Sequence, residues 1–197
     1  MKKLKLNSIV SLKDKFRYIK ENHRKNILKR VAKVCVGSST VRVFKHSHQI
    51  RGKLQDIDVE KLLDIQNEDN FREWFENKLD EVTKVIPKTT SRSKKITDGA
   101  RKWGYGAKIL NLFLRDIVFQ HRYFAEKDAD RIQSFLYVPL DSIVLGQLHE
   151  LGKQRPKKIK NIDSSEKFYK IQEKLGDEAK KAKVPRIWFD DMWVDQQ

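Results

Sequence analysis

The sequence contains few cysteines, few prolines and no long apolar run. Cys35 is the single cysteine among 197 residues, which excludes an intramolecular disulfide and four-cysteine zinc or iron–sulfur sites within a monomer. No apolar run reaches the length of about eighteen residues that a membrane span needs, and no apolar stretch follows the lysines at the start. We therefore expect a cytoplasmic, nucleoid-associated monomer with no metal, no cofactor and no membrane partner.

Positive charge is abundant and unevenly distributed. The formal net charge is +16. Residues 1–55 hold 16 Lys and Arg against 2 acidic residues, residues 56–86 hold 4 against 10, and residues 87–110 hold 7 against 1. Such blocks can be merely a solvated surface, but the first block exceeds what solubility needs. Two basic blocks around an acidic one are typical of a nucleic-acid face built from separate parts of the chain, so we predict double-stranded DNA as the partner.

Apolar spacing predicts an all-α fold in one compact globule. Alternation in "TVRVFKHSHQI" adds a possible short β element near residues 40–50. Two regions are expected within this globule. Residues 1–86 form a basic and acidic helical region that packs on the core, and residues 87–197 form the second region. The expected helices cover residues 9–34, 58–86, 95–103 and 107–124, a segment that begins after Pro139 and is capped by Asp141 or Ser142, and residues 163 to about 183.

The stretch "WGYGAKILNLF", residues 103–113, predicts a glycine turn at the entry to the most apolar helix. Gly104 and Gly106 suit a hairpin that needs positive φ and leaves room for a phosphate, which backbone N–H groups at a helix start can bind. Tyr105 at the hairpin tip becomes a candidate for DNA contact. Four nearby cations add to the expected DNA-binding set, namely Lys94, Lys95, Arg101 and Lys102.

These residues resemble the helix-hairpin-helix superfamily of DNA glycosylases, especially its 8-oxoguanine glycosylase branch. Residues 104–108, "GYGAK", match the hairpin's Gly-x-Gly-x-Lys, and Pro139-Leu140-Asp141 is similar to the Pro-x-Asp that carries the catalytic aspartate. The resemblance implies a helix-hairpin-helix within 87–197, Lys108 as the nucleophile that attacks the sugar C1′, and Asp141 as its helper. It covers about residues 95–150, and Lys102-Trp103 stands where the family has Leu-Pro.

General chemistry agrees with these two roles. A lysine amine attacks only when neutral, and an aspartate at a helix N-cap is held and aimed by backbone N–H groups. Amine attack leaves a Schiff base, which permits elimination of the 3′ phosphate and hence lyase activity. A flipped base also needs an aromatic pocket, for which the tail offers Trp188, Phe189 and Trp193 for stacking and Asp190 or Asp191 for reading a donor group.

Simpler interpretations stay open beside this hypothesis. Lys108 can be a lysine that snorkels from an apolar helix, Asp141 only an N-cap, and the aromatic tail only a segment that packs on the core. Arg115 and His121 fit the Arg-x-x-x-x-x-His pattern resembling HEPN ribonucleases. A non-catalytic DNA-binding protein is the third alternative. The sequence does not fix the excised base, nor whether the role is DNA repair or antiviral defence against modified DNA.

Overall fold

The computed structural model describes residues 12–37, 44, 47–87, 99–120, 123–148, 156 and 158–192. Helices dominate these residues, which confirms the predicted all-α class. In chain order the elements are α1 (Leu12–Gly37), α2 (Ser47–Gln55), η1 (Val59–Leu63), α3 (Glu68–Lys84), α4 (Gly99–Arg115), the π-helical turn η2 (Asp116–Gln120), α5 (Glu126–Gln133), α6 (Ser142–Gln147), η4 (Ile159–Asn161), α7 (Ser165–Ala182), η5 (Arg186–Trp188) and α8 (Phe189–Met192). No helix in this described part is long and apolar enough to cross a membrane.

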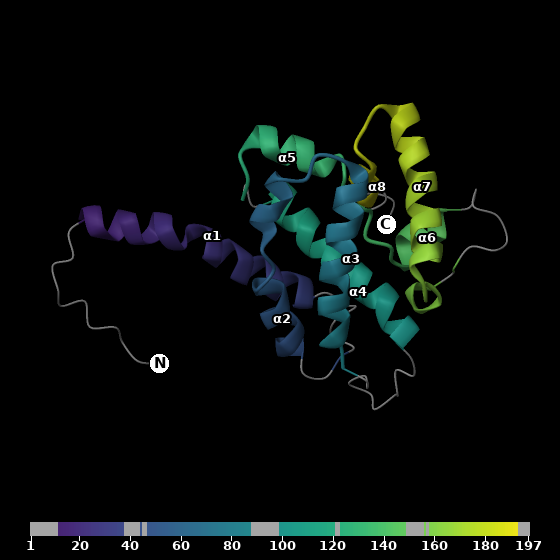
Figure 1. Ribbon diagram of the computed structural model, residues 1–197, viewed down its shortest axis with the longest axis horizontal. Helices are drawn as coiled ribbons and strands as arrows, with labels where there is room; N and C mark the ends of the chain where they lie inside the picture. Colours follow the sequence, from purple (N-terminus) through teal and green to yellow (C-terminus); the bar gives the residue numbers. More distant parts are fainter. Residues whose placement is uncertain are drawn as a thin grey trace.

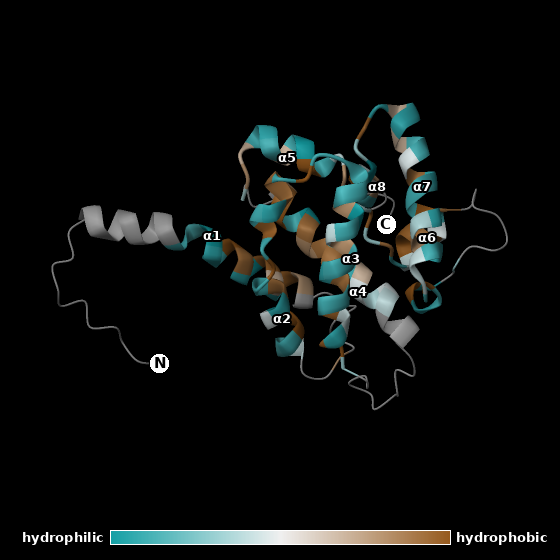
Figure 2. Ribbon diagram, in the orientation of Figure 1, coloured by the Kyte–Doolittle hydropathy of each residue, from teal (hydrophilic) through white to brown (hydrophobic). Residues whose placement is uncertain are grey.

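Helix α4 forms the centre of the molecule. Figure 1 shows α3 crossing it on one side, α6 and α7 standing on the other, and α5 lying over its C-terminal end, while the first turns of α1 extend away from the helical body. Apolar colour in Figure 2 is concentrated where these helices face one another. Residues 106–111 of α4 are all buried, as expected of a helix surrounded by others.

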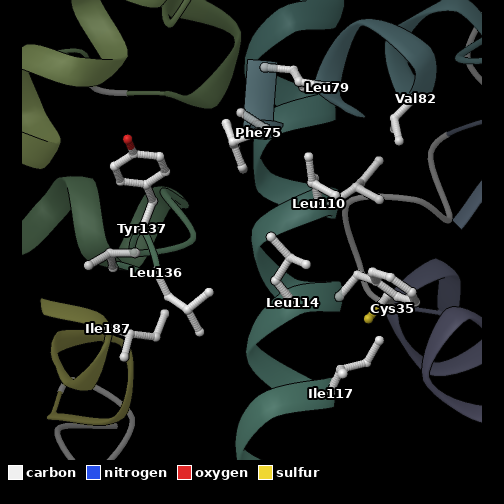
Figure 3. Packing of buried hydrophobic residues seen from close by; sticks show 14 of the residues in the cluster. Cys35, Phe75, Leu79, Val82, Leu110, Leu114, Ile117, Leu136, Tyr137 and Ile187 are labelled. Atoms are coloured by element: carbon white, nitrogen blue, oxygen red, sulfur yellow. The ribbon is translucent and has the colours of Figure 1, made fainter. Parts of the chain in front are cut away.

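One apolar cluster joins the two halves of the chain. Leu79 and Val82 of α3 point toward Leu110 of α4, and Cys35 of α1 lies near Ile117 (Figure 3). These side chains are at most 2 % exposed, and each of the aliphatic ones contributes roughly 1.5–3 kcal/mol relative to an exposed position. Residues of 1–86 and of 87–197 therefore share one core.

Side-chain caps define where three helices begin. Asn67 accepts a hydrogen bond from Asn70 N (2.9 Å) at the start of α3, so the polar "NEDN" marks a helix start. Asp141 caps α6, as predicted. Ser164, one residue later than the predicted Asp163, caps α7 by accepting from Lys167 N.

The predicted glycine hairpin is wrong. Gly104, Tyr105 and Gly106 lie inside the continuous helix α4, which replaces the two helices expected over 95–103 and 107–124. A Cβ on Gly104 would lie 2.6 Å from the carbonyl oxygens of Ile159 and Ile162, and a Cβ on Gly106 would lie 2.6 Å from Thr83 Cγ2. Both glycines therefore serve close packing, of η4 and α3 against α4, and their N–H groups form no phosphate cradle.

Two further expectations change. In the segment expected to contain a β element, Phe44 forms a single β-bridge and residues 47–50 belong to α2, while residues 40–43, 45 and 46 lie outside the described residues. Phe44 packs edge-to-face on Tyr105, with ring centroids 5.3 Å apart, so Tyr105 is a half-buried packing residue at no hairpin tip. Helix α5 forms in a stretch for which no helix was predicted. The stretch is mostly polar, and Ile132 is its one buried residue.

Candidate functional site

Lys108 and Asp141 form a pair between α4 and α6. Lys108 Nζ lies 3.4 Å from Asp141 Oδ2, and the two side chains are 10 % and 26 % exposed. The lysine is held in the apolar middle of α4, between buried Ala107 and Ile109. Two residues that are 33 positions apart in the sequence thus meet at one partly covered point, as the hypothesis required.

The two oxygens of Asp141 have different tasks. Oδ1 accepts hydrogen bonds from Ile143 N (2.8 Å) and Val144 N (2.9 Å), which fixes the carboxylate at the start of α6. Oδ2 faces Lys108 Nζ. Because the backbone holds one oxygen, the other is aimed at the amine without a further side chain.

A buried glutamine positions the segment that delivers Asp141. Gln172 of α7 is 0 % exposed, donates from Nε2 to Val138 O (2.8 Å) and accepts at Oε1 from Val138 N (3.0 Å). These two hydrogen bonds pair the N–H and C=O groups of Val138, which lies in an extended segment without a sheet partner among the described residues. Sequence reasoning missed Gln172, since a single glutamine in a charged helix gives no signal.

A second ion pair joins α4 to the C-terminal segment. The guanidinium of Arg115 donates to Asp116 Oδ1 (2.7 Å and 2.9 Å) and to Asp190 Oδ2. Asp190, predicted to read a base, therefore contacts Arg115 in this state. Asp116 also accepts from Cys35 Sγ at 3.7 Å, and burial raises the pKa of the Cys35 thiol far above its usual range.

Arg186 anchors the C-terminal segment that carries Asp190. Its side chain donates to three backbone oxygens, those of Leu136, Phe135 and Gln172, and to Glu68 Oε1 at 2.9 Å. The guanidinium also lies over the Tyr137 ring, 4.6 Å from its centroid. A residue of this kind was not predicted, because its partners come from three distant parts of the chain.

One face of α4 carries the contacts of Lys108 and Arg115. Gly104, Lys108, Asn111 and Arg115 follow one another at helical spacings of four, three and four, so they lie on one side; we call them the α4 stripe. Gly104 meets η4, Lys108 meets α6 and Arg115 meets α8. Asn111, which the sequence analysis did not single out, is 1 % exposed, and neither of its side-chain polar atoms has a partner within the described part of the chain.

The other predicted site residues have separate contacts or are not described by the structure. Trp188 is 43 % exposed and donates from Nε1 to Gln133 Oε1 at 3.3 Å, while Phe189 is half-buried against the core. Arg101 and Lys102 lie in the first turns of α4, and their side chains are not described. Lys94, Lys95, His121 and Trp193 lie outside the described residues.

A cavity of about 460 Å³ opens at the far end of α4, between η2 and α5. Its walls include Val118, Phe119 and Phe124, with Asp130 and Gln133 as polar groups. Ten residues of chain, about 15 Å at the α-helical rise, separate Lys108 from Val118. This cavity is therefore distinct from the surroundings of the Lys108–Asp141 pair.

Within the described ranges, no cluster of three or more His, Cys, Asp and Glu side chains is arranged to hold a metal ion. Comparisons of the chain with protein-family models, with curated proteins and with solved structures found no match. The chemistry of the site is therefore argued from its own residues.

Proposed function

We propose that this protein is a DNA glycosylase with lyase activity, in which Lys108 is the nucleophile and Asp141 assists it. The observation that carries the proposal is the contact between Lys108 Nζ and an Asp141 carboxylate whose other oxygen is fixed by two backbone N–H groups. An amine and an oriented carboxylate within reach of each other provide a nucleophile and a group that can stabilise positive charge on a sugar. The missing hairpin leaves this pair, and not a phosphate clamp, as the basis of the proposal.

The proposed reaction begins with proton transfer. The Lys108 amine attacks only in its neutral form, and Asp141 Oδ2 at 3.4 Å is placed to receive the proton that leaves it. The nitrogen then forms a bond to C1′ as the glycosidic bond breaks. The leaving base takes the bonding pair and the proton that Asp141 had accepted. The restored carboxylate then carries a proton from the new secondary ammonium to the ring oxygen.

Opening of the deoxyribose ring gives a Schiff base between Lys108 Nζ and C1′. Loss of a proton from C2′ then expels the 3′ phosphate, and hydrolysis of the imine frees the lysine. Asp141 has two places in this sequence, since its carboxylate stabilises positive charge on the sugar and exchanges protons with the amine.

Support for duplex DNA as the substrate comes from α1. Lys25, Lys29 and Lys33 are exposed and spaced four apart, so they form one row along the helix, with exposed Arg30 beside it. Each cation that neutralises a phosphate releases a counterion, so binding should weaken steeply with salt. We infer that α1 carries part of the contact with the DNA backbone.

The test is borohydride trapping on duplex DNA that carries an abasic site. Wild type is expected to form a covalent complex, and Lys108→Ala to lose it by more than about 100-fold while still binding the duplex. Lys167→Ala is the matched control, because Lys167 also pairs with an aspartate, Asp163, at 2.7 Å but on the outer face of α7.

Two results decide against the proposal. Equal trapping by wild type and Lys108→Ala shows that another amine reacts. A wild type that binds duplex DNA, never traps, and releases no base from a broad panel of modified duplexes is a non-catalytic binding protein. RNA cleavage that depends on His121 points instead to the ribonuclease alternative, although Arg115 is here engaged by two carboxylates.

A further inference from the structure

Asn111 is a buried amide without a partner. Its side chain is 1 % exposed, and within the described residues both Nδ2 and Oδ1 lack a hydrogen bond. Buried amides are normally paired, since an unpaired one keeps the full penalty of leaving water. A leucine of similar size would fit the apolar middle of α4 without that penalty. An asparagine at this position therefore indicates a functional role.

The position of Asn111 points to a ligand near the Lys108–Asp141 pair. On the α4 stripe it lies one turn after Lys108 and one turn before Arg115, about 4.5 Å and 6 Å along the helix axis. Those two neighbours carry the ion pairs to α6 and α8. Asn111 therefore lies on the face of α4 that meets these two elements, between the proposed sugar-binding amine and the C-terminal segment.

The hydrogen-bonding groups of the Asn111 amide restrict the class of ligand that can bind there. A carboxamide presents one donor group and one acceptor in the same plane. Phosphate oxygens only accept, whereas purine edges place a donor next to an acceptor and are bound by asparagine through two hydrogen bonds. A base that is flipped out of the duplex exposes such an edge.

We propose that Asn111 reads the edge of the flipped base, and so determines which base is removed. This inference rests on the proposed function, since it requires a base whose sugar is at Lys108. Asn111 is 1 % exposed, so neighbouring side chains must move before a base reaches it. The bases favoured are those that present a donor beside an acceptor to the amide, a pattern that both purine and pyrimidine edges can carry.

The experiment compares wild type with Asn111→Leu on two substrates. One is a duplex with an abasic site, which has the sugar but no base. The other is the duplex whose base wild type releases fastest from a panel that includes 8-oxoguanine opposite cytosine. Asn111→Leu should trap on the abasic duplex within about twofold of wild type, yet release the base about 10- to 100-fold more slowly.

A melting measurement supplies an independent readout. Because the leucine removes an unpaired buried amide, Asn111→Leu should melt at the same temperature as wild type or higher. Asn77→Leu, at an exposed position of α3, is the matched control and should leave both reactions unchanged. If Asn111→Leu does not fold, Asn111→Ala is compared with wild type in the same two reactions, trapping on abasic DNA and base release.

Each outcome separates the inference from the proposed function. Equal base release by wild type and the Asn111 variants overturns the base-reading role and leaves Lys108 untouched. Loss of both reactions together shows that Asn111 supports the amine and does not read the base, which also overturns it. A wild type that traps on abasic DNA but releases no base overturns the inference and reduces the proposed function to its lyase step, whereas a wild type without either reaction ends both.

Discussion

Lys108 Nζ lies 3.4 Å from Asp141 Oδ2 across 33 positions of sequence. The contact depends on three local facts: α4 is apolar enough to hold a lysine at 8 % exposure, Asp141 caps α6, and Gln172 fixes the backbone of Val138 just before it. Because the Asp141 carboxylate caps α6 with one oxygen and faces Lys108 with the other, substitutions can test its capping role and its catalytic role separately.

Asp141→Asn should separate catalysis from capping. Asparagine caps as well as aspartate, so the capping contribution to the free energy of unfolding should stay within about 0.5 kcal/mol of wild type. A larger loss of stability would report the missing charge beside Lys108. The loss of the carboxylate should slow base release by roughly 100-fold or more, as typically follows removal of a group that transfers protons or stabilises charge. Urea unfolding and single-turnover base release measure the two effects.

Asp141→Ala is the companion variant. It should lose the same activity and, in addition, about 1 kcal/mol of stability, because Ile143 N and Val144 N lose their acceptor. Full activity in Asp141→Asn would reduce Asp141 to a helix cap.

Gly104→Ala tests the close packing that replaced the hairpin. Alanine is favoured over glycine inside a helix by about 1 kcal/mol, but here the new Cβ would meet two carbonyl oxygens at 2.6 Å. Since those oxygens belong to the backbone of η4, we expect a net loss of roughly 1–3 kcal/mol in thermal or urea unfolding.

Gly52→Ala is the control for this change. Gly52 lies inside α2, and a Cβ there would meet nothing within 4 Å, so we expect a gain of about 0.5–1 kcal/mol. Stabilisation by both substitutions would show that η4 does not pack on Gly104.

Arg186→Met should destabilise the protein by about 3 kcal/mol. The methionine fills the space but leaves the carbonyl oxygens of Leu136, Phe135 and Gln172 with fewer donors in a buried place. Arg24→Met removes an exposed pair with Glu60 and should change stability by less than about 1 kcal/mol. Similar values for the two variants in urea unfolding would contradict the anchoring role of Arg186.

Alkaline pH should weaken the fold through Tyr123. Burial, and next the hydrogen bond to Glu60 Oε1 at 2.9 Å, raise the pKa of Tyr123 from 10.0 to about 12. The folded protein therefore holds this proton more tightly than the unfolded chain does. Its contribution is complete below pH 10 and is lost as the pH rises toward 12.

Urea unfolding at several pH values in this window measures the effect. Tyr123→Phe should give a shallower fall in the free energy of unfolding between about pH 10 and pH 12, because phenylalanine does not titrate. An unchanged slope would show that other groups, such as the buried Tyr137 whose pKa is also raised by burial, account for the whole fall.

The sequence by itself determined the features that depend on a single segment. The apolar period of residues 107–119 predicted a central helix, and the polar residue after Pro139-Leu140 predicted a helix start, so Asp141 and the burial around Lys108 followed. These signals are local, since helical spacing and N-cap chemistry act within a few residues.

Only the tertiary structure decided what the glycines do and which polar residues gather on α4. A glycine permits both a turn and a close approach, and it is the nearness of η4 and α3 that made Gly104 and Gly106 packing positions inside a helix. The roles of Gln172 and Arg186 likewise depend on hydrogen bonds to distant segments, and that of Asn111 on the absence of a partner within the described residues. The physical reason is that a hydrogen bond or a steric contact between distant segments leaves no periodic trace in either segment.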